Sequence, residues 1–367
     1  MKILFVITGL GLGGAEKQVC LLADKLTACH HEVKIISLTS ASNNKVLPNN
    51  SNIEVISIDM KKSVWGLFKG VMTVRKIIRS FLPDIVHGHM FHANIISRLA
   101  TIGKQKQIGV ISTAHNKNEG GSLRMLAYRL TDWLCDKCTN VSKEALEEFI
   151  RLRAFRSEKS MTMYNGIDVE KFRFNSTLRE NIRDGLNIKE NEVLMLAVGR
   201  LTEAKDYPNL LNALVLLPSH FKLAILGDGH LHAYISRMIT ELNLETRVTL
   251  LGTRDDVAPY YSACDIFVLA SRWEGFGLVV AEAMSCERLV VGTDSGGVRE
   301  VIGDGNFLVP ISDATRLADK IKSLMLESLE NKKKIASRNR QYIVNNFSIE
   351  SVITQWQDVY QSYRETK

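Results

Sequence analysis

Short apolar runs of strand length alternate with helical patterns along nearly the whole chain, and this alternation limits the fold more than any other feature. The runs occupy residues 3–8, 33–38, 53–58, 85–87 and 109–113 in the first half, and 193–198, 222–226, 248–251, 266–270, 289–291 and 307–309 in the second. Because helical segments separate them, we expect mainly parallel sheets with ligands at the carboxyl ends of the strands. A chain of 367 residues is long enough for two such doubly wound α/β domains.

The boundary between the domains is predicted at Tyr164-Asn165-Gly166-Ile167-Asp168, because an Asn-Gly step favours a turn. We therefore assign residues 1–166 to the first domain and residues 167–347 to the second. Residues 348–367 contain one further helical pattern. Its apolar side chains fall largely on one side of the helix, at Ile349, Val352, Ile353, Trp356, Val359 and Tyr360.

One stretch of the second half combines two carboxylates with a glycine-rich corner. After the run 266–270, the segment Glu274-Gly275-Phe276-Gly277 opens a helix that continues through Leu278 to Glu282. The first-turn amides of a helix have no intrahelical partners and carry the positive end of its dipole, so they favour a phosphate group. Glu282 is placed to accept hydrogen bonds from a ribose, and Glu274 to meet sugar hydroxyls. The alternative is an acidic loop residue followed by an ordinary helical glutamate.

A second glycine-rich turn, which includes Gly13 and Gly14, follows the first apolar run and precedes a helix expected to reach Ala28. Such a turn lets the backbone approach a ligand phosphate, but the G-x-G-x-x-G spacing of a dinucleotide site is not kept. Two segments that contain histidine, His87-Gly88-His89 and Thr113-Ala114-His115-Asn116, also fall at expected carboxyl ends of strands. His87 and His89 are interpreted either as lining an acceptor site or as packing residues.

The composition is that of an ordinary globular protein, with 45% hydrophobic and 24% charged residues. No apolar run approaches the roughly 20 residues that span a bilayer. The opening residues 1–8 are too short for a signal-peptide core and lack a small-residue cleavage site after them, so we interpret them as the first strand. We expect the protein to stay in the cytoplasm.

Positive charge is concentrated in the first half of the chain. Residues 1–173 carry 25 Lys and Arg against 15 Asp and Glu, which gives +10, whereas the remainder carries −3. This asymmetry predicts an anionic partner. Nucleic acid is not the expected one, because no binding motif accompanies the charge. Residues 61–81 mix six cations with apolar residues and place Trp65, Phe68 and Met72 on one helical face. Such a helix either contacts an anionic membrane or simply covers the sheet.

The six cysteines show no disulfide-scaffold spacing and lie in apolar surroundings, so we interpret all of them as structural thiols. Cys135-x-x-Cys138 has no second pair of Cys or His nearby to complete a zinc site.

Seven motifs in a fixed order resemble those of the GT-B glycosyltransferases, and most closely the retaining enzymes of family 4. They are Gly13-Gly14-Ala15-Glu16, Thr113-Ala114-His115-Asn116, Tyr164-Asn165-Gly166-Ile167-Asp168, Val198-Gly199-Arg200-Leu201 with Lys205, Gly227-Asp228-Gly229, Glu274-Gly275-Phe276-Gly277 through Glu282, and Ser295-Gly296-Gly297. The resemblance covers nearly the whole chain. It implies two Rossmann-like domains that face each other across a cleft, with the C-terminal helix 348–367 returning to the first domain.

The resemblance also implies roles for individual residues. Arg200 and Lys205 would neutralise the diphosphate of a nucleotide-sugar, and His115 would contact the transferred sugar. The expected catalytic residues are His115, Glu274, Arg200 and Lys205. The expected donor-binding residues are Gly13, Gly14, Arg200, Lys205, Gly227, Glu274, Gly275, Phe276, Gly277, Leu278 and Glu282. Weaker candidates on the acceptor side are Glu16, His89, Asn116, Arg124 and Asn165.

The expected activity is the retaining transfer of a hexose or N-acetylhexosamine from a nucleotide-diphosphate sugar, with UDP preferred, to a lipid-linked saccharide in surface polysaccharide biosynthesis. The chain lacks an Asp-x-Asp motif, so we expect neither a metal nor another cofactor. The acceptor would place the enzyme at the inner face of the cytoplasmic membrane, with 61–81 as the candidate contact. Two alternatives remain: a nonhydrolysing UDP-sugar epimerase, and a non-enzymatic sugar-binding protein of the same fold.

Overall fold

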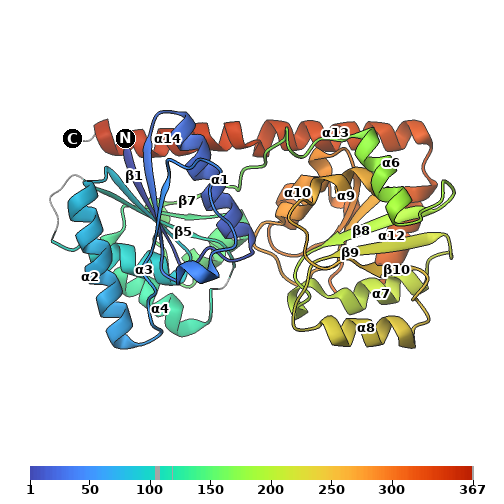
Figure 1. The fold of residues 1–367 in the computed structure, drawn as a ribbon, viewed down its shortest axis with the longest axis horizontal. Coiled ribbons are helices and arrows are strands. Elements are labelled where there is room, and N and C mark those ends of the chain that lie inside the picture. Colours follow the sequence, from blue (N-terminus) through green and yellow to red (C-terminus); the bar gives the residue numbers. More distant parts are fainter. Residues whose placement is uncertain (104–107, 118, 366–367) are drawn as a thin grey trace. The chain divides into compact units, whose positions relative to one another are not determined.

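The computed structural model describes residues 1–103, 108–117 and 119–365, which form two compact units (Figure 1). Unit 1 comprises Met1–Gly166 and the chain from Ile349 onward, and unit 2 comprises Ile167–Ser348. Each unit is a parallel sheet with helices on both faces. The predicted α/β class, with two doubly wound domains, is therefore confirmed.

The sheet of unit 1 has the strand order β3-β2-β1-β4-β5-β6-β7, and neighbouring strands run parallel. Its strands are β1 (Lys2–Ile7), β2 (Glu32–Ser37), β3 (Glu54–Ser57), β4 (Ile85–His89), β5 (Gly109–Ala114), β6 (Lys137–Asn140) and β7 (Ser160–Thr162). The sequence predicts the first five to within two residues at each end. It misses β6 and β7, because these are three or four residues long and largely polar, and they form by pairing with a strand that is already buried.

The helices of unit 1 lie on both faces of this sheet. They are α1 (Gly14–Ala28), α2 (Val64–Phe81), α3 (Phe91–Ala100), α4 (Ser122–Thr131), α5 (Lys143–Arg151) and α14 (Ile349–Glu365). Helices α1 and α14 share one hydrophobic cluster with the sheet, whereas α2 and α3 share a second, and α3, α4 and α5 share a third. Helices α2 to α5 therefore cover the face opposite α1 and α14.

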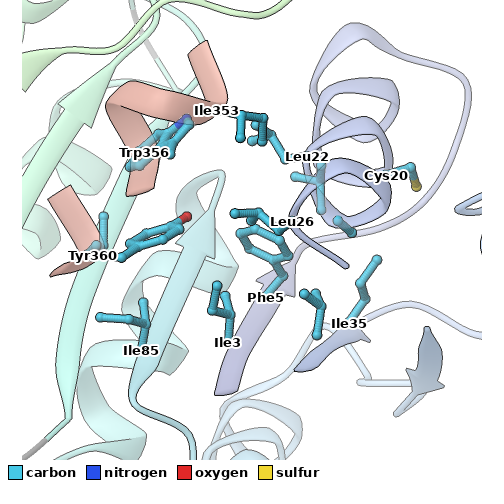
Figure 2. Close-up of a cluster of buried hydrophobic side chains, with 14 of the residues drawn as sticks. Ile3, Phe5, Cys20, Leu22, Leu26, Ile35, Ile85, Ile353, Trp356 and Tyr360 are labelled. Atoms are coloured by element: carbon cyan, nitrogen blue, oxygen red, sulfur yellow. The ribbon is translucent and has the colours of Figure 1, made fainter. Parts of the chain in front are cut away.

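The C-terminal helix α14 is part of the core of unit 1. Figure 2 shows Ile353, Trp356 and Tyr360 packed among side chains of α1 and the central strands. The six apolar positions predicted to share one side of this helix are all buried. The amphipathic pattern is thus explained by burial against a sheet that residues 2–162 form.

Helix α2 buries one face and exposes another. Val74, Ile78 and Phe81 pack into the core, whereas Trp65 and Phe68 keep 72% and 57% of their surface exposed. Ser63 caps the helix by accepting a hydrogen bond from the Gly66 amide at 3.0 Å. The helix therefore does cover the sheet, but the face that carries Trp65 and Phe68 is left unburied.

Unit 2 has the strand order β10-β9-β8-β11-β12-β13. Its strands are β8 (Val193–Val198), β9 (Phe221–Leu226), β10 (Val248–Leu250), β11 (Ile266–Leu269), β12 (Leu289–Thr293) and β13 (Leu308–Val309). Its helices are α6 (Ser176–Gly185), α7 (Tyr207–Val215), α8 (His232–Glu241), α9 (Ala258–Ala263), α10 (Leu278–Ser285), α11 (Val298–Ile302), α12 (Ala314–Leu326) and α13 (Leu329–Phe347), with a short 3₁₀ turn η4 (Glu203–Lys205) after β8. Every strand predicted here is present. Within the described part of the chain, no helix combines the length and the apolar character needed to cross a bilayer.

Candidate active site

The predicted donor residues of unit 2 follow the carboxyl ends of β8 and β11, except for Gly227, which follows β9. These two strands are neighbours in the sheet, and the chain continues from them in opposite directions, toward β9 and toward β12. Such a switch point leaves a crevice between the outgoing loops, and ligands of open α/β sheets bind there. Lys205 lies in the segment that follows β8, and Glu274 lies in the loop that follows β11. The sequence motifs therefore lie where the topology predicts a ligand.

Lys205 and Glu274 are in direct contact. The Lys205 ammonium forms an ion pair with Glu274 Oε1, and Ser271 Oγ donates to the same oxygen at 2.7 Å. Only 18% of the Lys205 side chain and 13% of the Glu274 side chain are exposed. A glycine at position 199 makes room for the lysine, because a Cβ there would lie 2.7 Å from Lys205 Cε. The sequence places both residues in one site but does not predict this pair.

Helix α10 begins at the predicted corner. Gly277 has φ +94°, a left-handed conformation that suits glycine, and Leu278 is the first helical residue. Gly275 and the side chain of Phe276 are buried, and the Phe276 ring packs on Phe347 at 5.4 Å between centroids. Phe276 therefore fixes the turn from the core, which leaves its backbone as the part available to a donor.

Glu282 lies on α10 and is 7% exposed. Its Oε2 accepts a hydrogen bond of 2.7 Å from the hydroxyl of Tyr261, which is fully buried on α9. Burial and the Glu282 carboxylate together raise the pKa of Tyr261, so the phenol stays a donor. Tyr261 thus orients Glu282. The sequence does not reveal this contact, because the two residues are 21 positions apart.

Two further donor candidates differ in how they are held. The Arg200 side chain is exposed and forms no hydrogen bond or ion pair with any residue that the structure describes. Gly227 packs tightly, since a Cβ on it would lie 2.0 Å from the Gly199 carbonyl oxygen. The glycine at position 227 is therefore required by the close approach of two loops, whatever its role toward a ligand.

In unit 1 the glycine-rich turn joins β1 to α1, with Gly13 as the N-cap and Gly14 as the first helical residue. The Glu16 carboxylate folds back over this turn, because a Cβ on Gly13 would lie 2.3 Å from Glu16 Oε2. The turn follows β1, whose neighbour β4 ends at His89, and this is the switch point of the first sheet.

Three histidines of β4 and of the residue after β5, His87, His89 and His115, contact one another in that order. His89 Nδ1 and His115 Nε2 are 3.1 Å apart, and the His87 and His89 rings stack with centroids 4.1 Å apart. His87 is held by Tyr360 of α14 at 2.8 Å and by Thr113 at 2.7 Å. Of the two interpretations left open for His87, the structure supports packing. His89 is 1% exposed and supports His115 from below.

All three imidazoles are kept neutral by burial. Desolvation lowers the pKa of His87 and His89 well below the ordinary value, and it lowers the pKa of His115 to about 4. The His89–His115 contact therefore joins one N–H to one free nitrogen lone pair. A neutral His115 can donate or accept a hydrogen bond, but it cannot act as a general acid at neutral pH.

Glu119 supports His115 through the backbone. Its Oε1 accepts a hydrogen bond from the His115 amide at 3.1 Å, and its Oε2 accepts one from the Tyr128 hydroxyl at 2.5 Å. Burial raises the pKa of Glu119 to about 7, although both hydrogen bonds and Arg124 oppose the rise. Sequence reasoning missed Glu119, for which the only available signal was its position four residues after His115.

The remaining acceptor-side candidates have separate places. Arg124 donates to the Glu119 carbonyl at 2.7 Å and lies over the Phe91 ring, so it is tied to the support of His115. Asn116 is exposed, directly after His115. Asn165 is buried after the edge strand β7, two strands away from β5, and is not brought into the histidine group.

Comparison with known proteins identifies the family. The family described as Glycosyltransferase Family 4 matches residues 12–171, and Glycosyl transferases group 1 matches residues 179–342. The fold is that of HepE from Anabaena in complex with UDP-glucose, with a TM-score of 0.86, 23% identity and coverage of 99% of this chain and 100% of the other. The chain is a GT-B glycosyltransferase of family 4.

Two curated relatives illustrate the range of the family. The N-acetyl-alpha-D-glucosaminyl L-malate synthase of Bacillus anthracis is 28% identical to this glycosyltransferase over 289 residues, which are 76% of this chain and 74% of the relative. The N-acetylgalactosamine-N,N'-diacetylbacillosaminyl-diphospho-undecaprenol 4-alpha-N-acetylgalactosaminyltransferase of Campylobacter jejuni is 28% identical over 341 residues, which are 88% and 90%.

One further contact of this glycosyltransferase lies beside the Lys205–Glu274 pair and was not predicted. Asp206 is buried and left-handed, with φ +46°, and it accepts from Arg272 Nε at 2.9 Å and from Ser312 at 2.6 Å. It therefore ties the loop after β8 to the loop after β11. Among the described residues, no cluster of three or more His, Cys, Asp or Glu side chains is arranged to hold a metal ion.

Proposed function

We propose that this glycosyltransferase transfers a hexose or N-acetylhexosamine from a UDP-sugar to a lipid-linked saccharide with retention of configuration. The observation that carries the proposal is the Lys205–Glu274 pair at the β8–β11 switch point, beside the start of α10. When a donor binds, its sugar hydroxyls would form hydrogen bonds with Glu274 and its diphosphate would pair with Lys205. These contacts would replace the ion pair between the two side chains. The pair thus holds both charges in place before the ligand arrives.

Charge accounts for the chemical step. The leaving nucleoside diphosphate gains negative charge as its bond to the sugar breaks, and Lys205, Arg200 and the first amides of α10 would stabilise it. A neutral His115 would form a hydrogen bond with the sugar while positive charge develops on the sugar ring. Retention would follow from attack on the face that the diphosphate leaves. The donor assignment is supported by the fold shared with a UDP-glucose complex.

The proposed acceptor is a lipid-linked diphosphate rather than a small free acid such as malate. The relative named for a diphospho-undecaprenol acceptor matches 88% of this chain, against 76% for the malate enzyme. The excess of ten positive charges in residues 1–173 would suit an anionic lipid surface as well as its diphosphate.

The exposed face of α2 supports attachment to that surface. Val64, Trp65, Phe68 and Met72 form an apolar tip near the start of the helix, and Lys69 lies on the same face. Farther along, that face carries exposed cations. A second apolar stripe, which the sequence analysis did not find, consists of Leu123, Leu126 and Leu130 on α4, the helix that flanks α3 on the same side of the sheet. Aromatic side chains beside lysines are typical of contacts with a lipid interface.

The double substitution Trp65→Glu/Phe68→Glu is expected to release the protein from anionic vesicles. Wild type should sediment with vesicles that contain phosphatidylglycerol and bind phosphatidylcholine vesicles less, and the variant should lose most of the bound fraction because the two exposed aromatic anchors become charged. Leu326→Glu/Leu329→Glu is the matched control, since these leucines are equally exposed but lie in unit 2. Equal binding by variant and wild type would refute the α2 contact.

The experiment that tests the proposed function is donor turnover with a panel of UDP- and GDP-sugars. Release of UDP that depends on an added undecaprenyl-diphosphate saccharide is expected, and the anomeric configuration of the product reports retention. Interconversion of free UDP-sugars without acceptor would instead identify an epimerase. Binding without any turnover would identify a sugar-binding protein, and no binding of any donor would overturn the proposal.

A further inference from the structure

Arg98 on α3 is a fully buried cation of unit 1 that lacks a carboxylate partner. Its Nε donates to Ser112 Oγ at 3.0 Å, its Nη1 to the Tyr128 carbonyl at 3.0 Å, and its Nη2 contacts Cys138 Sγ at 3.4 Å. No ion pair to Arg98 occurs in the described part of the chain. A guanidinium does not lose its proton in a protein, and a buried charge is costly unless an opposite charge is near. Arg98 therefore calls for an anion.

Two thiols lie beside it. The sulfurs of Cys135 and Cys138 are 3.7 Å apart, and Cys135 Sγ lies 3.3 Å from Ser112 Oγ, which Arg98 also contacts. Both cysteines are buried at the start of β6. The structural interpretation of the Cys135-x-x-Cys138 motif explains its burial but not its position against an unpaired guanidinium.

Cations outnumber carboxylates in this cluster. Arg98 is fully buried, and the more accessible Lys159 and Arg156 both pair with Asp132 Oδ2, at 3.1 Å and 3.3 Å. An ionised Cys135 would lower the net charge of these groups from +2 to +1. Burial by itself raises the pKa of the Cys135 thiol, but the hydrogen bond from Cys138 and the charge of Arg98 outweigh it, and the pKa is lowered. The pKa of Cys138 is raised, so Cys138 keeps its proton.

We propose that Cys135 and Cys138 form an oxidisable dithiol in which the Cys135 thiolate serves as the counter-anion of Arg98 and reacts with a peroxide. The thiolate attacks one peroxide oxygen: an S–O bond forms, the O–O bond breaks, and hydroxide leaves. The Cys135 sulfur is oxidised to a sulfenic acid and the peroxide is reduced. Cys138 then attacks that sulfur: the S–S bond forms, the S–O bond breaks, and the Cys138 proton leaves with the hydroxyl group as water.

Oxidation removes the anion beside Arg98 and thereby acts on the support of His115. Arg98 holds the carbonyl of Tyr128, whose hydroxyl donates to Glu119, and Glu119 accepts the amide of His115. The disulfide leaves the buried Arg98 with one negative charge fewer near it, so we expect α4 to be destabilised where it carries Tyr128. The dithiol would then lower the stability of unit 1, and with it the activity, when the cell is oxidising.

The pair lies one residue away from a surface hollow. Asp132 Oδ1 accepts from Cys138 at 3.5 Å, and the same Asp132 lines the hollow together with Phe155 and Arg156. We expect hydrogen peroxide, which is small and uncharged, to reach the pair from this side.

The test treats the full-length protein with hydrogen peroxide, denatures it in the presence of iodoacetamide to block the remaining thiols, and locates the products by peptide mass spectrometry. We expect a Cys135–Cys138 disulfide that dithiothreitol reverses and that forms about tenfold faster than any oxidation of Cys264 or Cys286. Those two are internal controls, because they are also buried but burial raises the pKa of Cys264 to about 12 and raises that of Cys286 as well.

The melting temperature provides a readout that does not depend on glycosyltransferase activity. Oxidised wild type should melt below the reduced protein, and Cys135→Ser should not respond to peroxide. Oxidation of Cys135 no faster than that of Cys264 would overturn the dithiol. A disulfide that leaves the melting temperature unchanged would overturn its link to Arg98. Because both comparisons use wild type, they hold even where Cys135→Ser fails to fold.

Discussion

Replacement of Glu274 by alanine is expected to lower kcat/KM by about 100-fold or more, and Lys205→Ala should do the same. In the proposed mechanism both side chains would act on charge that develops in the transition state, the lysine on the diphosphate and the carboxylate on the sugar. In the free enzyme they also neutralise each other with little solvent access. Each single substitution would therefore remove the proposed contact to the donor and leave a largely buried charge without its partner.

The double variant separates these two effects. Removing both partners abolishes the unpaired charge, so Glu274→Ala/Lys205→Ala should recover stability relative to either single variant and gain no activity. Glu274→Gln keeps an acceptor for Ser271 and removes only the charge, which isolates its electrostatic part. Turnover and melting temperature are measured for each protein.

A second ion pair of unit 2 provides the matched control. Lys222 and Glu192 are 21% and 13% exposed, much like Lys205 and Glu274, but they lie at the amino ends of β8 and β9, opposite the switch point. Glu192→Ala should cost a comparable amount of stability without the loss of turnover. If Glu274→Ala turns over donor at close to the wild-type rate, the assignment of Glu274 is wrong.

The sequence predicts the architecture because that architecture rests on local patterns. The alternation of apolar runs and helices specifies the strands that bury both faces, and the Gly277 corner marks the start of α10. The sequence pattern does not predict β6 and β7, because these strands are stabilised by pairing with neighbouring strands rather than by their own composition. The apolar side chains beside Trp65 on α2 likewise lie outside the core, so core packing does not account for them.

The site is predicted at the level of loops and not of contacts. Motif order brings Lys205 and Glu274 to adjacent strand ends, but their ion pair depends on the room left by Gly199. His87 and His115 look alike in sequence, since each follows an apolar run. His87 forms a hydrogen bond with Tyr360, which lies near the other end of the chain, and no local pattern reveals that partner.

Substitution of Glu282 is expected to weaken binding of UDP more than it slows turnover at saturating donor. A hydrogen bond to a charged group contributes about 1.5–3 kcal/mol, so Glu282→Ala should raise the Kd for UDP by about 10- to 100-fold if the carboxylate binds the ribose. The kcat should stay within a few-fold of wild type, because the ribose does not change charge in the reaction. Titration calorimetry with UDP and steady-state kinetics give the two numbers.

Tyr261→Phe tests how Glu282 is held. The substitution removes one hydroxyl and leaves Oε2 of Glu282 without its 2.7 Å donor, so the carboxylate should lose its fixed orientation and the Kd for UDP should rise about fivefold. Tyr342→Phe is the control, because this tyrosine of unit 2 also loses a hydrogen bond, to the Glu300 carbonyl, but does not touch Glu282. If Glu282→Ala leaves the affinity for UDP unchanged and lowers kcat, Glu282 acts in the chemical step and not in nucleotide binding. The division of labour between Glu274 and Glu282 would then be refuted.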